Sequence, residues 1–226
     1  MNARTEARAR MHAALGDPVR LAIVDRLWLG DESPSTLAAD FELPTNLLAH
    51  HLRALEDAGI VRRVRSEGDR RRSYVQLRFD DPIVVTLAAT SDPHWTADRV
   101  VFVCTQNSAR SQLAAAAWRT VSRVPAASAG TRPAERVHAR AVAAGARHGL
   151  RLGRARTARI EEVVRAGDLV VAVCDNAHEE LPAGGRLHWA MPDPVRVDTD
   201  EAFETTYAEI SQRVSLLATA VTTGSD

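Results

Sequence analysis

The stretch VVFVCTQNSARSQLAAAAWR, residues 100–119, decides the fold of the second half of the chain. Apolar residues lead directly into Cys104, a polar loop follows, and an alanine-rich helix begins near Ser108. In a strand–loop–helix unit of this kind, the backbone N–H groups of the loop lie at the positive end of the helix and can surround a tetrahedral oxyanion. The same field lowers the pKa of a thiol. The stretch therefore predicts an oxyanion site with a reactive cysteine.

The residue types in the loop suit this chemistry. Arg110 carries a guanidinium fork that matches two oxygens of a phosphate or an arsenate. Asn107 tolerates a left-handed backbone and can brace the loop, and Ser111 can donate its hydroxyl to the thiolate. The alternative is a buried core cysteine beside a surface arginine. The predicted oxyanion-binding residues are Thr105, Gln106, Asn107, Ser108, Ala109, Arg110 and Ser111.

Strand and helix patterns alternate on both sides of this loop. The predicted strands are 99–104, 125–129, 168–174 and 186–191, and the predicted helices are 109–123, 135–148, 158–166 and 200–219. Strands separated by helices indicate an α/β domain with a doubly wound, four-stranded parallel sheet between two layers of helices. We assign this domain to residues 99–226.

The first part of the chain has a different order. Helices are predicted at 16–30, 33–43 and 44–61, and two strand-like runs within 62–77 flank a hairpin turn at 67–69. In the first of these helices Leu21, Val24 and Leu27 share one face, which Ile23 widens. This order predicts an α+β winged helix-turn-helix domain over residues 1–80. Residues 81–98 contain two Asp-Pro breaks and are predicted to be a connector with one short helix.

The third helix is the candidate recognition helix, because the second helix of a helix-turn-helix lies in the major groove of DNA. Leu48, Leu52 and Leu55 would face the core, and six arginines within residues 62–72 could contact phosphates. The predicted DNA-binding residues are Thr45, Asn46, Ala49, His50, Arg53, Arg63, Arg65, Arg70, Arg71 and Arg72. The alternative for the arginines is a solvated hairpin.

The adjacent histidines His50 and His51 are an alternative metal-ligand pair. An exposed His pair on a recognition helix favours contact with DNA, so no metal site is predicted.

Composition limits the function classes. The chain has 226 residues, a formal net charge of zero, and 29 basic residues, all of them arginine. It has no apolar run near the roughly 18 residues of a membrane span, and its charged start does not resemble a secretion signal. Two cysteines in such a chain indicate reactive or buried thiols rather than a structural disulfide. We therefore expect a cytoplasmic protein of two domains without membrane contact.

The segments LGDPVRLAIVDRL and LLAHHLRALEDAGIVRRVRSEGDRRRSYVQL resemble the ArsR-type winged-helix repressors, which are metal- and arsenic-responsive regulators. The resemblance covers roughly residues 10–78. It implies a homodimer formed through the terminal helices of this domain and a palindromic DNA operator. Many members carry a cysteine pair on the helix that corresponds to 33–39, whereas this chain has SPSTLAA there. Thiolate sensing of arsenite within this domain therefore has no ligands.

The segments CTQNSARSQ, SAGT (128–131) and HWAMPDP (188–194) together resemble the low-molecular-weight phosphatases, especially their thioredoxin-type arsenate reductase branch. The resemblance covers about residues 99–220. It implies that Cys104 is the nucleophile, that Arg110 holds the oxyanion and that Asp193 is the general acid. Removing such an acid commonly lowers a rate by about 10² to 10⁴.

Two departures from that family bear on the chemistry. DPVRV follows where tyrosine phosphatases place aromatic residues, which disfavours a phosphotyrosine pocket. The thioredoxin-linked reductases carry two further cysteines after the third strand; here Cys174 matches the first, and Leu181 stands in place of the second. Cys174 is either a resolving thiol that attacks Cys104 or a buried apolar cysteine. We expect no bound cofactor but an external thiol reductant, either mycothiol, glutathione or a thioredoxin-type protein.

Three functions stay open at this point. The first is an operator-binding regulator fused to an active arsenate reductase or phosphatase-like enzyme. The second is a regulator whose phosphatase-like domain only senses arsenate, phosphate or oxidants. The third is a low-molecular-weight phosphatase whose N-terminal domain serves dimerisation. The complete set of Cys104, Arg110 and Asp193 favours retained catalysis, and the basic hairpin argues against the third function.

Overall fold

The computed structural model of the chain describes residues 2–88, 94–182 and 186–223, which form two compact units. One unit is built mainly from the residues before 89, and the other mainly from the residues after 93. Part of the predicted connector and the last residues of the predicted C-terminal domain lie outside the described residues.

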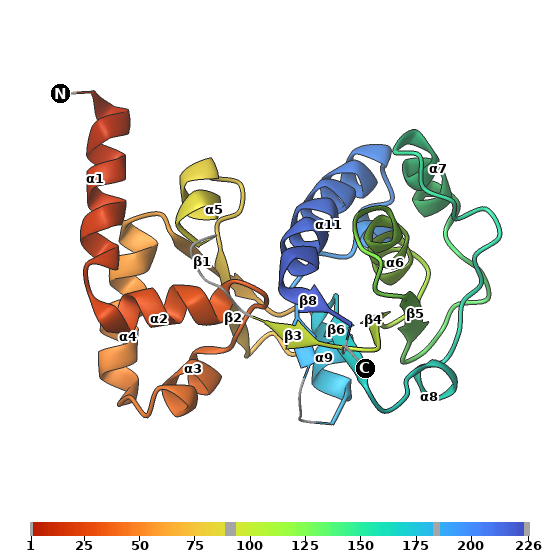
Figure 1. The fold of residues 1–226 in the computed structure, drawn as a ribbon, viewed down its shortest axis with the longest axis horizontal. Coiled ribbons are helices and arrows are strands. Elements are labelled where there is room, and N and C mark those ends of the chain that lie inside the picture. Colours follow the sequence, from red (N-terminus) through yellow and green to blue (C-terminus); the bar gives the residue numbers. More distant parts are fainter. Residues whose placement is uncertain (1, 89–93, 183–185, 224–226) are drawn as a thin grey trace. The chain divides into compact units, whose positions relative to one another are not determined.

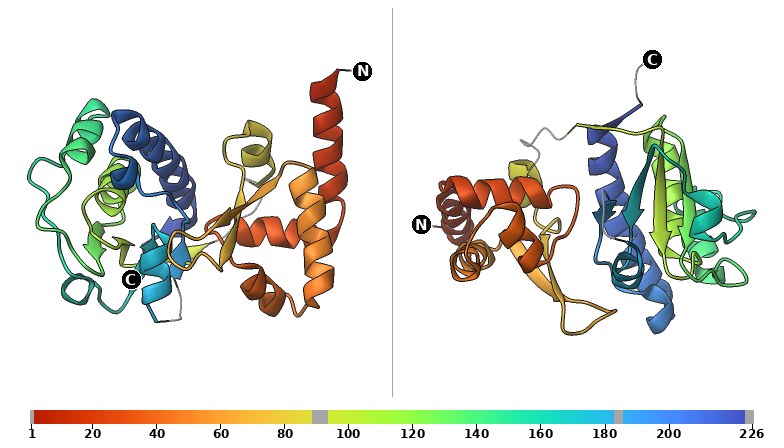
Figure 2. Two further views of the ribbon diagram at one scale, coloured as in Figure 1. Left: turned by 180° about the vertical axis from the view of Figure 1, so that it is seen from behind. Right: turned by 90° about the horizontal axis from the view of Figure 1, so that it is seen from below.

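The first unit combines helices with a two-stranded antiparallel hairpin (Figures 1 and 2). Its elements are α1 (Ala3–Leu15), α2 (Pro18–Leu27), α3 (Pro34–Asp40), α4 (Thr45–Asp57), β1 (Val61–Arg65), β2 (Ser73–Leu77) and α5 (Pro82–Ala88). Side chains set the helix starts, because Asp17 accepts a hydrogen bond from the Arg20 N–H and Ser33 accepts one from the Thr36 N–H. This is the predicted winged helix-turn-helix order.

The core of this unit lies where α2, α3 and α4 meet the hairpin. Leu48, Leu52 and Leu55 of α4 are at most 1% exposed, as their helical spacing predicts. The prediction for α2 was wrong in one residue. Leu21 is 40% exposed, because the buried face is centred on Ile23, Val24 and Leu27 and its position falls at the edge of that face.

The hairpin differs in detail from the predicted tight turn. Its two strands pair from Val61 opposite Leu77 to Arg65 opposite Ser73, so residues 66–72 form the connecting loop. Glu32 adds an isolated antiparallel bridge to Val75 of β2, with hydrogen bonds of 3.2 and 2.8 Å between their backbones. The predicted short helix after the hairpin is α5.

The second unit is a four-stranded parallel sheet between helices (Figure 1). The order of its strands is β5-β4-β6-β7, and β3 and β8 form a separate parallel pair. The strands are β3 (Trp95–Thr96), β4 (Arg99–Cys104), β5 (Ala126–Gly130), β6 (Asp168–Ala172), β7 (Arg186–His188) and β8 (Val221–Thr222). The helices are α6 (Arg110–Val121), α7 (Ala139–Arg147), α8 (Ile160–Val163), α9 (Asp175–Glu180), α10 (Pro194–Val197) and α11 (Asp200–Ala220).

Helices cover both faces of this sheet. The helices α6 and α11 pack against each other and against α7 on one side, and α8 and α9 lie on the other side (Figure 1). The apolar residues of β4 are fully buried because the strand is central and covered on both faces. At the beginning of β4, Arg99 forms an ion pair of 2.6 Å with Asp168 of β6.

Several predicted bounds in this unit were too long. The helix predicted at 158–166 is only Ile160–Val163, because the residues before it run alongside the end of β5, where Arg159 bridges to Gly130 and the Gly130 N–H donates to the Ala158 carbonyl. The strands predicted at 168–174 and 186–191 end at Ala172 and His188. The pair β3–β8 and the short helices α9 and α10 were not predicted.

Candidate functional site

The predicted thiol loop connects β4 to α6, at the carboxyl end of the central strands. Cys104 is the last residue of β4 and is 2% exposed. Its Sγ lies 3.1 Å from Ser111 Oγ and 3.2 Å from the Asn107 backbone N–H, which donates to it. The Asn107 N–H and the Ser111 hydroxyl thus both lie within hydrogen-bond distance of the sulfur.

Outer contacts hold the loop in its curved shape. Asn107 has a φ of 50°, the left-handed conformation expected for it. The carbonyl groups of the loop accept hydrogen bonds from the segment that follows β5. The bonds run from Thr131 N–H to Cys104, from Arg132 N–H to Thr105, from Ala134 N–H to Gln106 and from His138 N–H to Ser108. These four bonds hold the loop's carbonyl groups toward the segment after β5, while the Asn107 N–H is directed to Cys104 Sγ.

Gly130, at the end of β5, permits this close packing. A Cβ atom placed there would lie 2.8 Å from the Thr105 carbonyl oxygen, 3.0 Å from Asn107 Cβ and 3.1 Å from the Asn107 nitrogen. A side chain at this position would therefore press on the loop itself. Gly130 was not among the predicted site residues, although it lies in the small-residue segment SAGT at the end of a strand.

Arg110, the first residue of α6, is buried with 4% exposure. Its Nη1 donates to the Met191 carbonyl at 2.8 Å, and its Nη2 lies 3.2 Å from Asp193 Oδ2. Burial alone would lower the pKa of Arg110. The nearby thiol groups of Cys174 and Cys104 and the carboxylate of Asp193 instead hold that pKa above its usual value. The guanidinium is thus a fixed positive charge beside Cys104.

Asp193 is brought to the same site from the other end of the sequence. It is the N-cap of α10, and its Oδ1 accepts a hydrogen bond of 3.3 Å from the Val195 N–H. Its side chain is 19% exposed while its Oδ2 pairs with Arg110. The structure therefore joins Cys104, Arg110 and Asp193, which lie up to 89 positions apart in the sequence.

Cys174 follows β6, the strand next to β4, and is the N-cap of α9. Its Sγ lies 3.6 Å from Thr105 Oγ1 and accepts a hydrogen bond of 3.5 Å from the Ala177 N–H. Both cysteines are free thiols. Burial raises the pKa of Cys174, and Arg110 counteracts this in part. Cys174 is 1% exposed, so it is buried and also adjacent to the loop that holds Cys104.

The remaining loop residues differ in exposure. Gln106 is exposed and Thr105 is half-buried, whereas Asn107, Ser108, Ala109 and Ser111 are buried. A residue that sequence reasoning missed is Gln112, which is 5% exposed and donates to Asn107 Oδ1 at 3.1 Å. A glutamine inside a helix is usually solvated, so no pattern in the sequence marked it.

The candidate DNA-binding helix α4 has one exposed face. Its exposed predicted residues are Thr45, Asn46, Ala49, His50 and Arg53. Leu47, which was not predicted, is 41% exposed on the same helix. His51 was wrongly grouped with His50 as an exposed pair. It is only 7% exposed because its ring faces α2, where Nδ1 lies 3.7 Å from Asp17 Oδ1.

The predicted arginines of the hairpin are all exposed: Arg63, Arg65, Arg70, Arg71 and Arg72. Arg63 donates to Glu56 of α4 at 2.9 Å, so part of its charge is neutralised within the unit. Arg62 donates to Gln76, which in turn donates to buried Asp31. These contacts hold the two strands together at the end away from the connecting loop.

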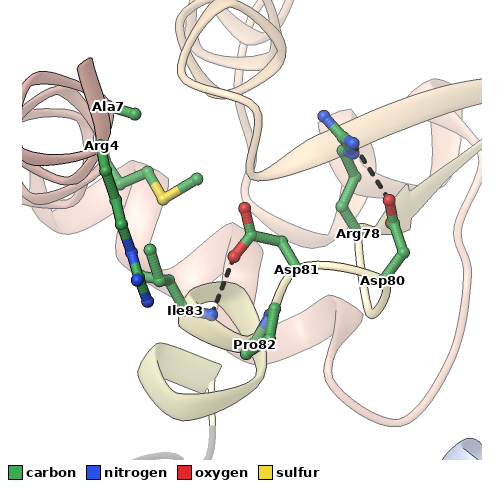
Figure 3. A pocket seen from close by; sticks show the side chains of 8 residues that line it. Arg4, Ala7, Arg78, Asp80, Asp81, Pro82 and Ile83 are labelled. Atoms are coloured by element: carbon green, nitrogen blue, oxygen red, sulfur yellow. Dashed lines mark hydrogen bonds and ion pairs between the residues drawn. The ribbon is translucent and has the colours of Figure 1, made fainter.

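A cavity of about 320 Å³ lies in the first unit beside α1 and the start of α5 (Figure 3). Arg78 donates to Asp80 at 3.0 Å, and Asp81 caps the turn by accepting from the Ile83 N–H at 2.8 Å. The lining residues are Arg4, Ala7, Met11, Arg78, Asp80, Asp81, Pro82 and Ile83. Its charges compensate each other locally and assign no particular ligand.

Two further features follow from the described part of the chain. Its His, Cys, Asp and Glu side chains form no group of three that could hold a metal ion. Within the same residues, no helix combines the length and apolar character needed to cross a membrane.

Two known families match the chain. A helix-turn-helix domain family matches residues 15–64, and the family of low molecular weight phosphotyrosine protein phosphatases matches residues 99–225. A comparison with curated protein sequences gives no match.

Two solved structures illustrate the similarity. Arsenate reductase from Archaeoglobus fulgidus is 32% identical with a TM-score of 0.47, over 53% of this chain and 98% of that chain. The tyrosine phosphatase Wzb from Escherichia coli K30, in complex with sulphate, is 23% identical with a TM-score of 0.50, over 54% of this chain and 97% of that chain. The second likeness shows the fold. The predicted fusion of two domains is confirmed: the chain belongs to the low molecular weight phosphotyrosine protein phosphatase family and carries a helix-turn-helix domain before the phosphatase fold.

Proposed function

We propose that this protein is a DNA-binding regulator of the ArsR type whose second domain reduces arsenate with the Cys104 thiolate. The observation that carries the proposal is the site itself. Cys104 Sγ accepts a hydrogen bond from the Asn107 N–H and lies 3.1 Å from the Ser111 hydroxyl, and Arg110 lies beside it. A thiolate, a cradle of N–H groups and a guanidinium together bind and attack a tetrahedral oxyanion.

In the first step the Cys104 thiolate attacks arsenic and an S–As bond forms, while one hydroxyl of arsenate receives a proton from Asp193 and leaves as water. Arg110 pairs with Asp193 in the structure, at 3.2 Å. An oxyanion bound to Arg110 competes for the same guanidinium and releases Asp193 toward the leaving oxygen. This is the general acid step that the resemblance implies.

In the second step the Cys174 thiolate attacks Cys104 Sγ. The S–S bond forms and the S–As bond breaks. Its electron pair stays on arsenic, which leaves as arsenite. The two thiols lose two electrons, and arsenic gains two. The adjacent strands that end near both cysteines support this step. An external thiol, either mycothiol, glutathione or a thioredoxin-type protein, then reduces the disulfide.

A second candidate activity is hydrolysis of phosphate monoesters, which the family match favours. It uses Cys104, Arg110 and Asp193 in the same roles but does not need Cys174. Single-turnover assays with arsenate and with an aryl phosphate separate the two activities. For arsenate reduction, Cys104→Ser and Cys174→Ser both abolish arsenite release. For hydrolysis, only Cys104→Ser abolishes phosphate release. If neither substrate reacts, the domain is a sensor of arsenate, phosphate or oxidants.

For the first domain we propose binding to a palindromic operator as a homodimer formed through α1 and α5. The exposed polar face of α4 and the exposed arginines of the hairpin support this role. Fluorescence anisotropy with the DNA upstream of the gene tests it. Binding that weakens steeply with salt supports the proposal, and the absence of salt-sensitive binding contradicts it in favour of a phosphatase with a dimerising module. Two free thiols are consistent with action in the cytoplasm.

Coupling between the two activities is a separate part of the proposal. A bound oxyanion or a Cys104–Cys174 disulfide would shift the dimer between two arrangements of its recognition helices. Operator affinity is therefore expected to change when arsenate or an oxidant is added. Equal affinity with and without them would exclude coupling.

A further inference from the structure

Gln112, which has no role in the chemistry proposed above, is connected to Cys104 by a chain of hydrogen bonds. Its Nε2 donates to Asn107 Oδ1 at 3.1 Å, and Asn107 Nδ2 donates to Ser111 Oγ at 2.9 Å. Ser111 Oγ lies 3.1 Å from Cys104 Sγ. All four side chains are buried, with at most 5% exposure.

Two backbone groups fix the orientation of both amides in this chain. The Ala158 N–H can only donate, so the Asn107 atom 3.0 Å away from it must be the oxygen Oδ1. The Arg156 carbonyl can only accept, so the Gln112 atom 2.9 Å away from it must be the nitrogen Nε2. The amide of Asn107 therefore has its oxygen toward Gln112 and its nitrogen toward Ser111.

This orientation determines where the Ser111 proton lies. Ser111 Oγ has one O–H to donate and already accepts a bond from Asn107 Nδ2. When Cys104 is a thiolate, which can only accept, the Ser111 proton is directed to Cys104 Sγ. If Asn107 were flipped, Ser111 would donate to Asn107 Oδ1 instead, and the sulfur would lose a charge-assisted donor.

We propose that Gln112 is a positioning residue that activates Cys104 through Asn107 and Ser111. Together with the Ala158 N–H, it holds the Asn107 amide in the orientation that directs the Ser111 hydroxyl to the sulfur. This inference rests on the proposed function in one respect, namely that Cys104 reacts as a thiolate. The other charged or titratable groups around Arg110 and the two thiols are Cys174 at the start of α9, Asp193 at the start of α10 and Glu67. The substitutions below leave these groups and Arg110 unchanged relative to their reference protein.

The test measures the pKa of Cys104 in the full-length protein from the rate of alkylation by iodoacetamide against pH. A Cys174→Ser background leaves Cys104 as the single thiol, because the chain has only two cysteines. Gln112→Met keeps the length of the side chain and removes its donor. We expect it to raise the pKa of Cys104 by about 1, a tenfold lower thiolate fraction below the pKa. Gln112→Asn, whose amide is too short to reach Asn107, shifts the pKa in the same direction and serves if the methionine variant does not fold.

A matched control separates positioning from support of the neighbouring segment. Thr157 Oγ1 donates to the Ala134 carbonyl at 2.7 Å and so holds the same segment through a different partner. Thr157→Val should leave the pKa of Cys104 unchanged. An equal shift in Thr157→Val and Gln112→Met would overturn the inference, because Gln112 would then act only by supporting residues 156–158.

A double-mutant cycle tests the route through Ser111. Ser111→Ala alone should raise the pKa of Cys104, and adding Gln112→Met should raise it no further. Additive shifts would overturn the inference. An ordinary thiol pKa near 8.5 in the reference protein would overturn the inference and the proposed function together. A low pKa that Gln112→Met and Gln112→Asn both leave unchanged would overturn this inference alone.

Discussion

The packing of Gly130 against the thiol loop leads to a prediction that can be worked out from distances. In Gly130→Ala, the added methyl group meets the Thr105 carbonyl oxygen at 2.8 Å and two atoms of Asn107 at 3.0 and 3.1 Å. Relieving the nearest contact to 3.4 Å requires a displacement of about 0.6 Å. Because Gly130 has no positive φ, the substitution adds this steric pressure without backbone strain.

The expected cost has two parts. Forcing one methyl group into a tightly packed position lowers the free energy of unfolding by about 1 to 3 kcal/mol. Moving the loop by about 0.6 Å also disturbs the N–H groups around the anion. Sites of this kind hold their geometry to about 0.5 Å, and a misplacement of about 1 Å can cost 10²-fold, so we expect phosphate to bind roughly tenfold more weakly.

Two measurements on the full-length protein check this prediction. Urea unfolding gives the loss of stability, and protection of Cys104 from iodoacetamide by inorganic phosphate gives the dissociation constant. Gly153→Ala is the matched control, because a Cβ atom at Gly153 meets nothing within 4 Å. The reasoning is refuted if Gly130→Ala keeps both the stability and the phosphate affinity of the wild type, or if Gly153→Ala loses as much.

Four further predictions concern other parts of the molecule. Asp193→Asn should slow single-turnover cleavage of an aryl phosphate by about 10² to 10⁴, and an unchanged rate would exclude its role as general acid. In operator titrations, Asn46→Ala should weaken the free energy of DNA binding by about 1 to 3 kcal/mol and relax specificity at one base pair. Arg70→Ala should weaken binding to all DNA sequences alike and reduce the slope of affinity against salt by about 1. Identical behaviour of the two variants would contradict the assignment of Asn46 to a base and Arg70 to a phosphate. Burial alone would raise the pKa of Asp168, but its hydrogen bonds, chiefly with Arg99, and the charge of nearby arginines together outweigh burial and lower that pKa. The contribution of Asp168 to stability should therefore be present above the ordinary aspartate pKa of about 3.9 and be lost as pH falls through the folded value. Asp168→Asn should remove this part of the acid sensitivity in urea unfolding at graded pH. Because burial raises the pKa of Cys174, the rate of disulfide formation after arsenate binding should rise about tenfold per pH unit across neutral pH, and stopped-flow quenching that shows a flat profile would contradict it.

Much of the fold follows from local patterns. The spacing of Leu48, Leu52 and Leu55 predicted the buried face of α4, and the apolar run before Cys104 predicted the central strand. Longer-range packing could not be predicted in this way. His51 follows the exposed His50 directly, yet its ring is buried and lies 3.7 Å from Asp17, the residue that caps α2. The helix expected at 158–166 is short because its first residues run alongside the end of β5.

In the candidate site, too, local patterns predicted some features and long-range packing decided the others. The residue types of Cys104, Asn107, Arg110 and Ser111 predicted an oxyanion loop, because each has a chemical reason at its position. The support of that loop comes from outside the motif, and its members carry no local signal. Gln112 has the appearance of a solvated helix residue, and only the fold places the Arg156 carbonyl and Asn107 within reach of its amide.

The central claim is that Cys104 is a nucleophilic thiolate that turns over its oxyanion with the help of Cys174. The most direct test is single-turnover reduction of arsenate by the fully reduced protein without any external thiol, with arsenite quantified and the disulfide detected by intact mass. We predict one arsenite and one Cys104–Cys174 disulfide per chain, and neither product in Cys104→Ser. The claim is contradicted if the wild type releases no arsenite, or if Cys104→Ser releases as much as the wild type.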